Sequence, residues 1–160
     1  MNPPDLLVLS IAIGIVVSFV FSEVYGLAAG GVVVPGYIAL YLHKPMAIAL
    51  TLTIAFGTFA LVKVLSSFLI VYGRRRTSLT ILIGFTVGAW VSHLELLSGV
   101  PALEDLETTV IGYIIPGLIA IWFDRQGIVP TVASLAIATS VVRLSLLFIA
   151  GPLALRGAVP

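Results

Sequence analysis

The sequence predicts an all-α integral membrane protein built from two repeats of about three helical segments each. Three observations lead to this prediction: an apolar composition, four stretches long enough to cross a bilayer, and a segment that occurs twice. Hydrophobic residues make up 60% of the 160 residues and charged residues only 9%, whereas roughly a quarter of the residues of a soluble domain are charged. The chain therefore carries too little charge to cover a surface that faces water.

Four apolar stretches are long enough for a membrane span, because a bilayer core of about 30 Å needs roughly 17 to 25 residues of helix. Two shorter stretches contain Pro-Gly, and an unbroken helix of either would cover only about 20 Å. The short stretches either cross the membrane or re-enter it on one side, and their length leaves both open. The long stretches are 6–22, 46–72, 78–97 and 128–149, and the short ones are 28–42 and 110–123.

The Pro-Gly segment marks an internal duplication. GVVVPGYIAL at 31–40 returns as GYIIPGLIAI at 112–121. The duplication divides a single membrane domain into a first repeat, 1–76, and a second repeat, 77–160. Three crossings in each half would make the repeats inverted, as in many transporters, whereas re-entrant short segments would make them parallel. We favour inverted repeats because the distribution of basic residues allows three crossings per half.

Basic residues also predict the orientation of the chain. Arg74, Arg75 and Arg76 form the densest cluster, and the positive-inside rule places such a cluster in the cytoplasm. Six crossings would then put Arg125 on the cytoplasmic side and the acidic connection that holds Asp105 outside. The first residues lack the basic region of a cleaved signal peptide, so we interpret the first apolar stretch as a retained span.

Composition excludes several kinds of site. The chain has no cysteine and two histidines, which rules out thiolate and histidine-rich metal sites, so we expect no metal. Its eight basic residues are scattered and give a net charge of +1, which argues against nucleic acid as a partner. Neither a Gly-rich phosphate loop nor a GxSxG elbow is present. We therefore expect no catalytic residue and no cofactor in this chain.

Each Pro-Gly is a candidate site for an anion. Proline suits the first turn of a helix but not its interior, so we expect unwound backbone to lead into a half-helix that begins near Pro35 or Pro116. Free N–H groups at such a start attract carboxylates. The alternative is that Pro-Gly permits a kink and close helix packing. The candidate residues of a polymer or anion path are Pro35, Gly36 and Tyr37 in one repeat and Pro116, Gly117 and Leu118 in the other.

Lys63 and Arg143 lie at nearly equivalent places inside apolar stretches of the two halves. A charge in the membrane costs roughly 2.5 to 3.5 kcal/mol on insertion scales, so it is usually paired, hydrated or functional. Both cations would suit the path of a polyanion. Alternatively, Lys63 reaches the interface, or each cation pairs with Glu23 or Glu104. These two glutamates recur at the offset of the Pro-Gly segments, and we expect them mainly to brace the unwound backbone by accepting its N–H groups.

These pieces together resemble the PgsC/CapC family, the small membrane subunit of bacterial poly-gamma-glutamate synthesis. They occur in the family's order along nearly the whole chain, which makes the combination more specific than any one piece. The matching segments are SEVYG at 22–26, GVVVPGYIAL at 31–40, IVYGRRRT at 70–77, IIPGLIA at 114–120 and RQG at 125–127.

The resemblance implies a multi-pass protein of the bacterial cytoplasmic membrane, in contact with membrane lipid. It implies a complex with a cytoplasmic amide ligase of the Mur-ligase type, which would hold ATP and Mg, and with an externally exposed accessory subunit. This non-catalytic subunit would anchor the ligase and help to guide poly-gamma-glutamate outward. Ordinary positive-inside anchoring suffices to explain the arginines, but they can also form a docking surface for the ligase or for growing polymer; these arginines are Arg74, Arg75, Arg76 and Arg125. An independent small anion transporter or channel, and a purely structural anchor, are the alternatives.

Overall fold

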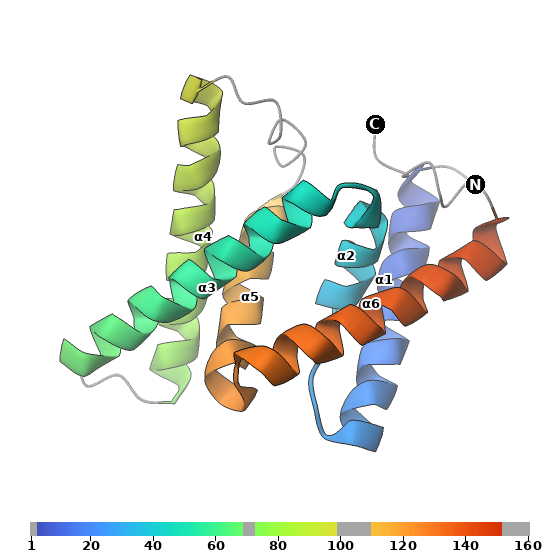
Figure 1. The fold of residues 1–160 in the computed structure, drawn as a ribbon, viewed down its shortest axis with the longest axis horizontal. Helices are drawn as coiled ribbons and strands as arrows, with labels where there is room; N and C mark the ends of the chain where they lie inside the picture. The colour runs from blue at the N-terminus through green and yellow to red at the C-terminus, as the bar shows by residue number, and fades with distance from the viewer. Residues whose placement is uncertain (1–2, 69–72, 99–109, 152–160) are drawn as a thin grey trace. The chain divides into compact units, whose positions relative to one another are not determined.

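The computed structural model describes residues 3–68, 73–98 and 110–151, in which every regular element is a helix and none is a strand (Figure 1). The prediction of an all-α chain is confirmed for this part of the protein. The elements are α1 (Pro3–Tyr25), α2 (Val34–Leu40), the 3-10 helix η1 (Tyr41–His43), α3 (Pro45–Phe68), α4 (Arg74–Ser98), α5 (Val110–Gln126) and α6 (Ile128–Ala150).

Three described helices are long and apolar enough to cross a membrane, which fits the predicted membrane location. They are Leu6–Tyr25 in α1, Pro45–Ser67 in α3 and Ile128–Ile149 in α6, with mean hydropathies of 2.4, 2.1 and 2.1. The fourth predicted long stretch, 78–97, forms most of α4, and its crossing of the membrane stays a prediction.

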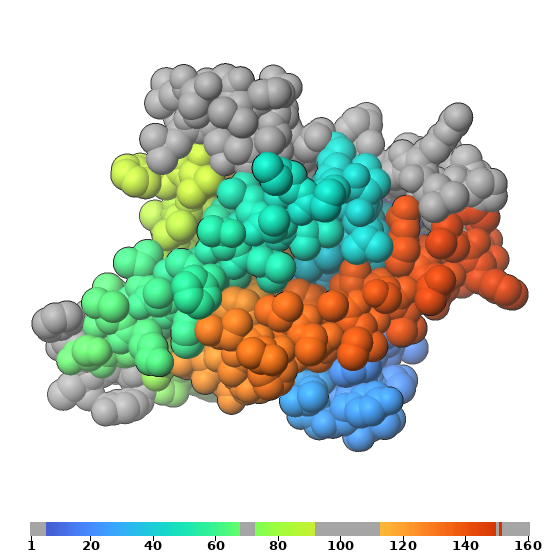
Figure 2. Space-filling model, viewed as in Figure 1, coloured from blue at the N-terminus to red at the C-terminus, as the bar shows by residue number. Residues whose placement is uncertain are grey.

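The exposed face of α6 is more apolar than its buried face, as expected for a helix that borders lipid. Val129, Leu144 and Phe148 are 77%, 66% and 94% exposed, whereas Thr131 and Ser134 are buried. Figure 2 shows much of α6, in orange to red, on the visible surface. Without a hydrophobic force between helices in lipid, membrane helices pack through small residues. This distribution of side chains is therefore that of a membrane helix rather than of a water-soluble one.

Exposed hydroxyl groups on the helices are satisfied within their own helix. Thr86 donates its hydroxyl to the carbonyl of Leu82 at 2.8 Å, and Ser140 and Ser145 donate to the carbonyls of Ala136 and Val141 at 2.8 and 2.9 Å. An unsatisfied polar group costs several kcal/mol in the bilayer core. Because these hydroxyls bond to the preceding turn, they can face lipid without that cost.

The described helices form two units. One unit holds α1, α2, η1 and α6, and the other holds α3, α4 and α5. The units do not follow the order of the chain, because the last helix of each sequence half, α3 or α6, belongs with helices of the other half. The predicted repeat boundaries at 1–76 and 77–160 describe the sequence and stay a prediction.

Two glycines bring α1 and α2 together in the first unit. A Cβ added to Gly14 would lie 2.6 Å from the Cα of Gly36, and a Cβ added to Gly36 would lie 2.6 Å from the carbonyl oxygen of Ser10. The Ser10 hydroxyl also donates to the carbonyl of Gly36 at 2.6 Å. Beyond this crossing, Ala39 and Leu40 of α2 pack with Val142 and Leu146 of α6 in one buried cluster.

Two glycines also bring α4 and α5 together in the second unit. A Cβ added to Gly84 would lie 2.6 Å from the Cα of Gly117 and 3.5 Å from the methyl group of Thr58 on α3. The segment before Gly84, TILIG at 80–84, resembles SIAIG at 10–14, which holds Gly14. This second likeness has an offset of 70 (80 minus 10), whereas the Pro-Gly segments have an offset of 81 (117 minus 36). A search at one fixed offset therefore misses it.

Candidate functional site

Basic residues of α4 and α5 meet in the second unit. Gly73 has a φ of +61°, a backbone conformation that glycine adopts without strain. Helix α4 begins at the next residue, so Arg74, Arg75 and Arg76 occupy its first turn. Asp124 and Arg125 lie in the last turn of α5.

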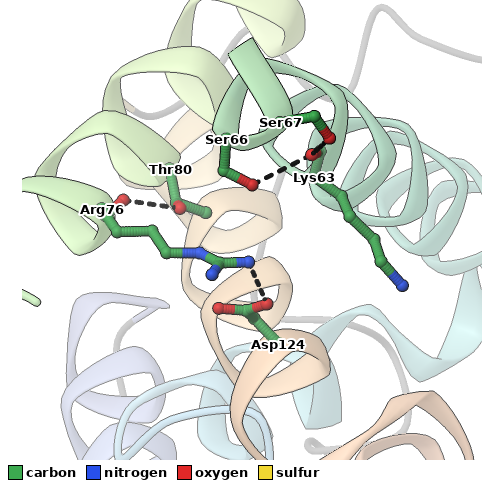
Figure 3. Close-up of polar contacts among 6 residues, drawn as sticks. All are labelled: Lys63, Ser66, Ser67, Arg76, Thr80 and Asp124. Atoms are coloured by element: carbon green, nitrogen blue, oxygen red, sulfur yellow. Dashed lines mark hydrogen bonds and ion pairs between the residues drawn. The ribbon is translucent and has the colours of Figure 1, made fainter. Parts of the chain in front are cut away.

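An ion pair joins these two helix ends. Arg76 donates from Nη2 to Asp124 Oδ1 at 2.6 Å (Figure 3), and the two side chains are 30% and 31% exposed. The Thr80 hydroxyl donates to the backbone carbonyl of Arg76 at 2.8 Å. An ion pair this exposed contributes about 0 to 1 kcal/mol. Its main effect is therefore to fix the direction of the Arg76 side chain.

The same helix ends line an open pocket of about 360 Å³. We call it the arginine pocket, and Arg75, which is exposed, is not among its lining residues. Arg125 lies over the ring of Trp122, with Cζ 5.4 Å from the ring centroid. This distance is that of a cation–π contact, which does not neutralise the charge of the guanidinium. The lining residues are Gly73, Arg74, Arg76, Thr77, Thr80, Ile121, Asp124 and Arg125.

Arg143 is buried in the first unit, where it bonds to backbone. Its relative exposure is 9%, and its Nη1 donates to the carbonyl of Ala39 at 3.3 Å. Ala39 lies in the last turn of α2, whose carbonyls lack partners within the helix and carry a partial negative charge. The guanidinium therefore stabilises the end of a short helix.

Lys63 has a different environment from Arg143. It is exposed on α3, and its Nζ lies 5.5 Å from the centroid of the Phe59 ring. Its backbone carbonyl accepts the hydroxyls of Ser66 and Ser67 at 2.9 and 3.2 Å. Figure 3 shows its side chain extending away from the pair of Arg76 and Asp124. The Lys63 ammonium is therefore not part of that ion pair.

The first Pro-Gly does start a helix, as the sequence predicted. Helix α2 begins at Val34, one residue before Pro35. At this helix start, Tyr37 donates its N–H to the carbonyl of Val33 at 3.2 Å, and its hydroxyl donates to that of Tyr41 at 3.2 Å. Gly36 is buried against α1. The packing of α1 on α2 therefore accounts for this glycine.

The second Pro-Gly does not start a helix, which corrects the prediction of a break near Pro116. Helix α5 runs without interruption from Val110 to Gln126 and contains Pro116 in its interior. Gly117 is buried in the middle of this helix, and a Cβ added to it would lie 3.2 Å from the Cα of Ile81. The N–H groups of Gly117 and Leu118 are thus within the helix rather than at its start.

Gln126, which sequence reasoning did not single out, holds the unwound segment between α1 and α2. Its side-chain amide pairs with the backbone of Ala28, accepting from the N–H at 3.0 Å and donating to the carbonyl at 2.7 Å. Ser134 also donates its hydroxyl to that carbonyl at 3.0 Å, and the Gln126 amide donates to the hydroxyl of Thr131 at 3.0 Å. The RQG segment at 125–127 was the feature of the sequence that could have pointed to Gln126.

Two glutamates were expected to brace this backbone, and one of them, Glu23, lies among the described residues. Glu23 is exposed in the last turn of α1. Glu104 lies outside the described residues, as does the rest of the acidic connection from 99 to 109. Among the described residues, no group of three or more His, Cys, Asp or Glu side chains could hold a metal ion.

Comparison with known proteins shows similarity to one protein family. A family model described as capsule biosynthesis CapC matches residues 13–132. The chain is similar to the PGA biosynthesis protein CapC of Bacillus subtilis (strain 168), with 34% identity over 129 residues that cover 80% of this chain and 85% of that protein. It is also similar to the capsule biosynthesis protein CapC of Bacillus anthracis, with 33% identity over the same shares of the two chains. No solved structure matches.

Proposed function

We propose that this chain, which belongs to the CapC family of capsule biosynthesis, is the membrane subunit of an assembly that makes and exports poly-gamma-glutamate. The observation that carries the proposal is the family match itself, since residues 13–132 include both Pro-Gly segments and the arginine cluster. The names of the two relatives refer to PGA and capsule biosynthesis. Three apolar helices support a place in the membrane.

The proposed partner on the cytoplasmic side is an amide ligase of the Mur-ligase type. Arg74 and Arg75 are exposed at the start of α4, and Arg125 is exposed at the end of α5. An acidic surface on the ligase would meet these charges, and complementary charge raises the rate and specificity of docking more than the affinity. ATP and Mg would be bound by the ligase, so this subunit would contribute no catalytic residue. An externally exposed accessory subunit would complete the assembly.

We further propose that the two sequence repeats have inverted orientations in the membrane and that cations of both repeats lie along the route of the polymer. Lys63 is the better candidate for direct contact, because its ammonium is exposed, whereas Arg143 is engaged with the carbonyl of Ala39. The glycines at the helix crossings would act indirectly, by allowing the backbones to approach closely. The chain would thus anchor the ligase and help to guide the polyanion.

Co-purification tests the proposal. The tagged chain is co-expressed with the Mur-ligase-like partner and extracted from membranes, and surface poly-gamma-glutamate is measured in the same cells. We expect the ligase to co-purify and polymer to need both proteins. The purified chain alone should show no glutamate-dependent ATP hydrolysis. Uptake of free glutamate by liposomes that contain this chain alone, without polymer in cells, would instead identify an independent transporter.

A further inference from the structure

We propose that the arginine pocket binds a carboxylate group of the glutamate chain. This inference rests on the proposed function, which supplies such a chain, and it adds substrate binding to the docking role proposed for Arg74 and Arg125. The pocket is lined by three arginines and one aspartate, which leave a formal charge of +2. Its volume of about 360 Å³ lies at the lower end of the range of roughly 300 to 1,000 Å³ for ligand sites.

The pocket already holds one carboxylate, that of Asp124. Arg76 binds it at 2.6 Å, a distance typical of a charge-assisted hydrogen bond. Within the described residues, no ion pair joins Arg74 or Arg125 to a carboxylate. Two guanidinium groups therefore remain available beside an arrangement that accepts a carboxylate. A second carboxylate entering the pocket can bind these two groups or exchange with Asp124.

The lining favours a carboxylate on a polar chain over the headgroup of a phospholipid. Ile121 is the one apolar side chain among the lining residues. Basic pockets at the cytoplasmic ends of membrane helices also bind lipid headgroups, so a headgroup is one outcome of the test below. The arginines and threonines offer donors on several sides, and this suits a chain whose repeating unit carries one carboxylate.

The test measures binding of a fluorescent γ-linked glutamate oligomer of about ten residues to the full chain, reconstituted in phosphatidylcholine nanodiscs. We expect the Arg74→Gln, Arg125→Gln double variant to bind about tenfold more weakly. Arg75→Gln is the matched control, because it removes a charge from the same helical turn but not from the pocket. It should change the affinity less than twofold. An oligomer of γ-linked glutamine should not bind.

Asp124→Asn provides a test of opposite sign. It removes the competing carboxylate and one negative charge, so the oligomer should bind severalfold more tightly. Binding no tighter than that of the wild-type chain would overturn the assignment of Arg76 to the ligand. Equal losses in the Arg75→Gln control and the double variant would reduce the effect to general surface charge and overturn the pocket. Melting temperatures of all variants identify any that fail to fold.

Two further outcomes separate the possible errors. Nanodiscs that contain phosphatidylglycerol form a second arm: if this lipid binds with the same dependence on Arg74 and Arg125 and the oligomer does not bind, the site is a headgroup site and the inference is wrong. If the double variant binds the oligomer normally while its complex still makes polymer, the inference fails and the proposed function stands. Absence of polymer from the wild-type complex would reject the proposed function itself.

Discussion

Replacing Gly36 with alanine should separate α1 from α2. The added Cβ would lie 2.6 Å from the carbonyl oxygen of Ser10 and 3.0 Å from the Cα of Ile11. Atoms in favourable contact lie about 3.5 to 4.0 Å apart, so the helices must move apart by roughly 1 Å. Both neighbours are backbone atoms, and no side-chain rotation can relieve the overlap.

The expected loss of stability is about 2 kcal/mol. Overpacking costs about 1 to 3 kcal/mol, and stretching the Ser10 to Gly36 hydrogen bond, 2.6 Å long, adds roughly 0.6 kcal/mol in a membrane protein. The higher helix propensity of alanine returns about 1 kcal/mol. For a chain of this size, such a loss lowers the melting temperature by roughly 4 to 8 °C.

The assay is thermal unfolding of the full chain in detergent micelles, followed by circular dichroism. Gly57→Ala is the matched control, because Gly57 lies within α3 and a Cβ there meets nothing within 4 Å. It should leave the melting temperature unchanged or raise it slightly. Gly117→Ala, whose nearest contact would be 3.2 Å, should give an intermediate loss. Equal melting temperatures for Gly36→Ala and Gly57→Ala would refute the reasoning.

Three further predictions concern other parts of the chain. Gln126→Glu replaces the donor to Ala28 and Thr131 with an acceptor, so the melting temperature should fall by an amount that corresponds to about 2 to 4 kcal/mol, and proteolysis between residues 26 and 33 should speed up; unchanged proteolysis would contradict the role of Gln126. Arg143→Gln should destabilise the chain by about 1 to 2 kcal/mol because α2 loses the cation at its end. Lys63→Gln should change the stability of the chain by no more than about 0.5 kcal/mol but should reduce polymer output. Lys63→Arg should retain most of that output. Cysteines introduced at Arg75 and Asp105 should react differently with a membrane-impermeant thiol reagent in intact cells, with labelling only at 105, and the absence of native cysteine keeps the background low; labelling of both would reject the orientation.

The helices of the described chain could largely be predicted from apolar length, but the two Pro-Gly segments could not be told apart. The stretch predicted at 128–149 is α6, Ile128–Ala150. Pro35 follows Gly30 and Gly31, which have φ angles of +72° and +129° and end any helix before it. Pro116 follows six helical residues that begin at Val110. A proline there leaves a carbonyl of the preceding turn without its donor, and neighbouring groups in a membrane protein can compensate for that.

The candidate site was only partly visible in the sequence. The positive-inside rule singles out Arg74 to Arg76 and Arg125, but it counts cations and gives Asp124 no weight. The ion pair of Asp124 with Arg76 spans 48 positions along the chain, so it depends on how α4 packs against α5. The contact of Gln126 with Ala28 spans 98 positions. Contacts between residues so far apart along the chain leave no periodic pattern in the sequence, so local sequence does not predict them.

Because α3 and α6 belong to different units, the two units are completed in a fixed order during synthesis. The unit of α3, α4 and α5 is continuous in the chain, from Met46 to Arg125, whereas the other unit combines Met1–Pro45 with residues from Gln126 onward. During synthesis the N-terminal part emerges first, yet α2 must wait for α6 to supply Arg143 and the partners of its buried cluster. The unit that begins first is therefore completed last. A chain that stops before α6 therefore contains every helix of the second unit, but its seven-residue α2 lacks the guanidinium that bonds to the carbonyl of Ala39.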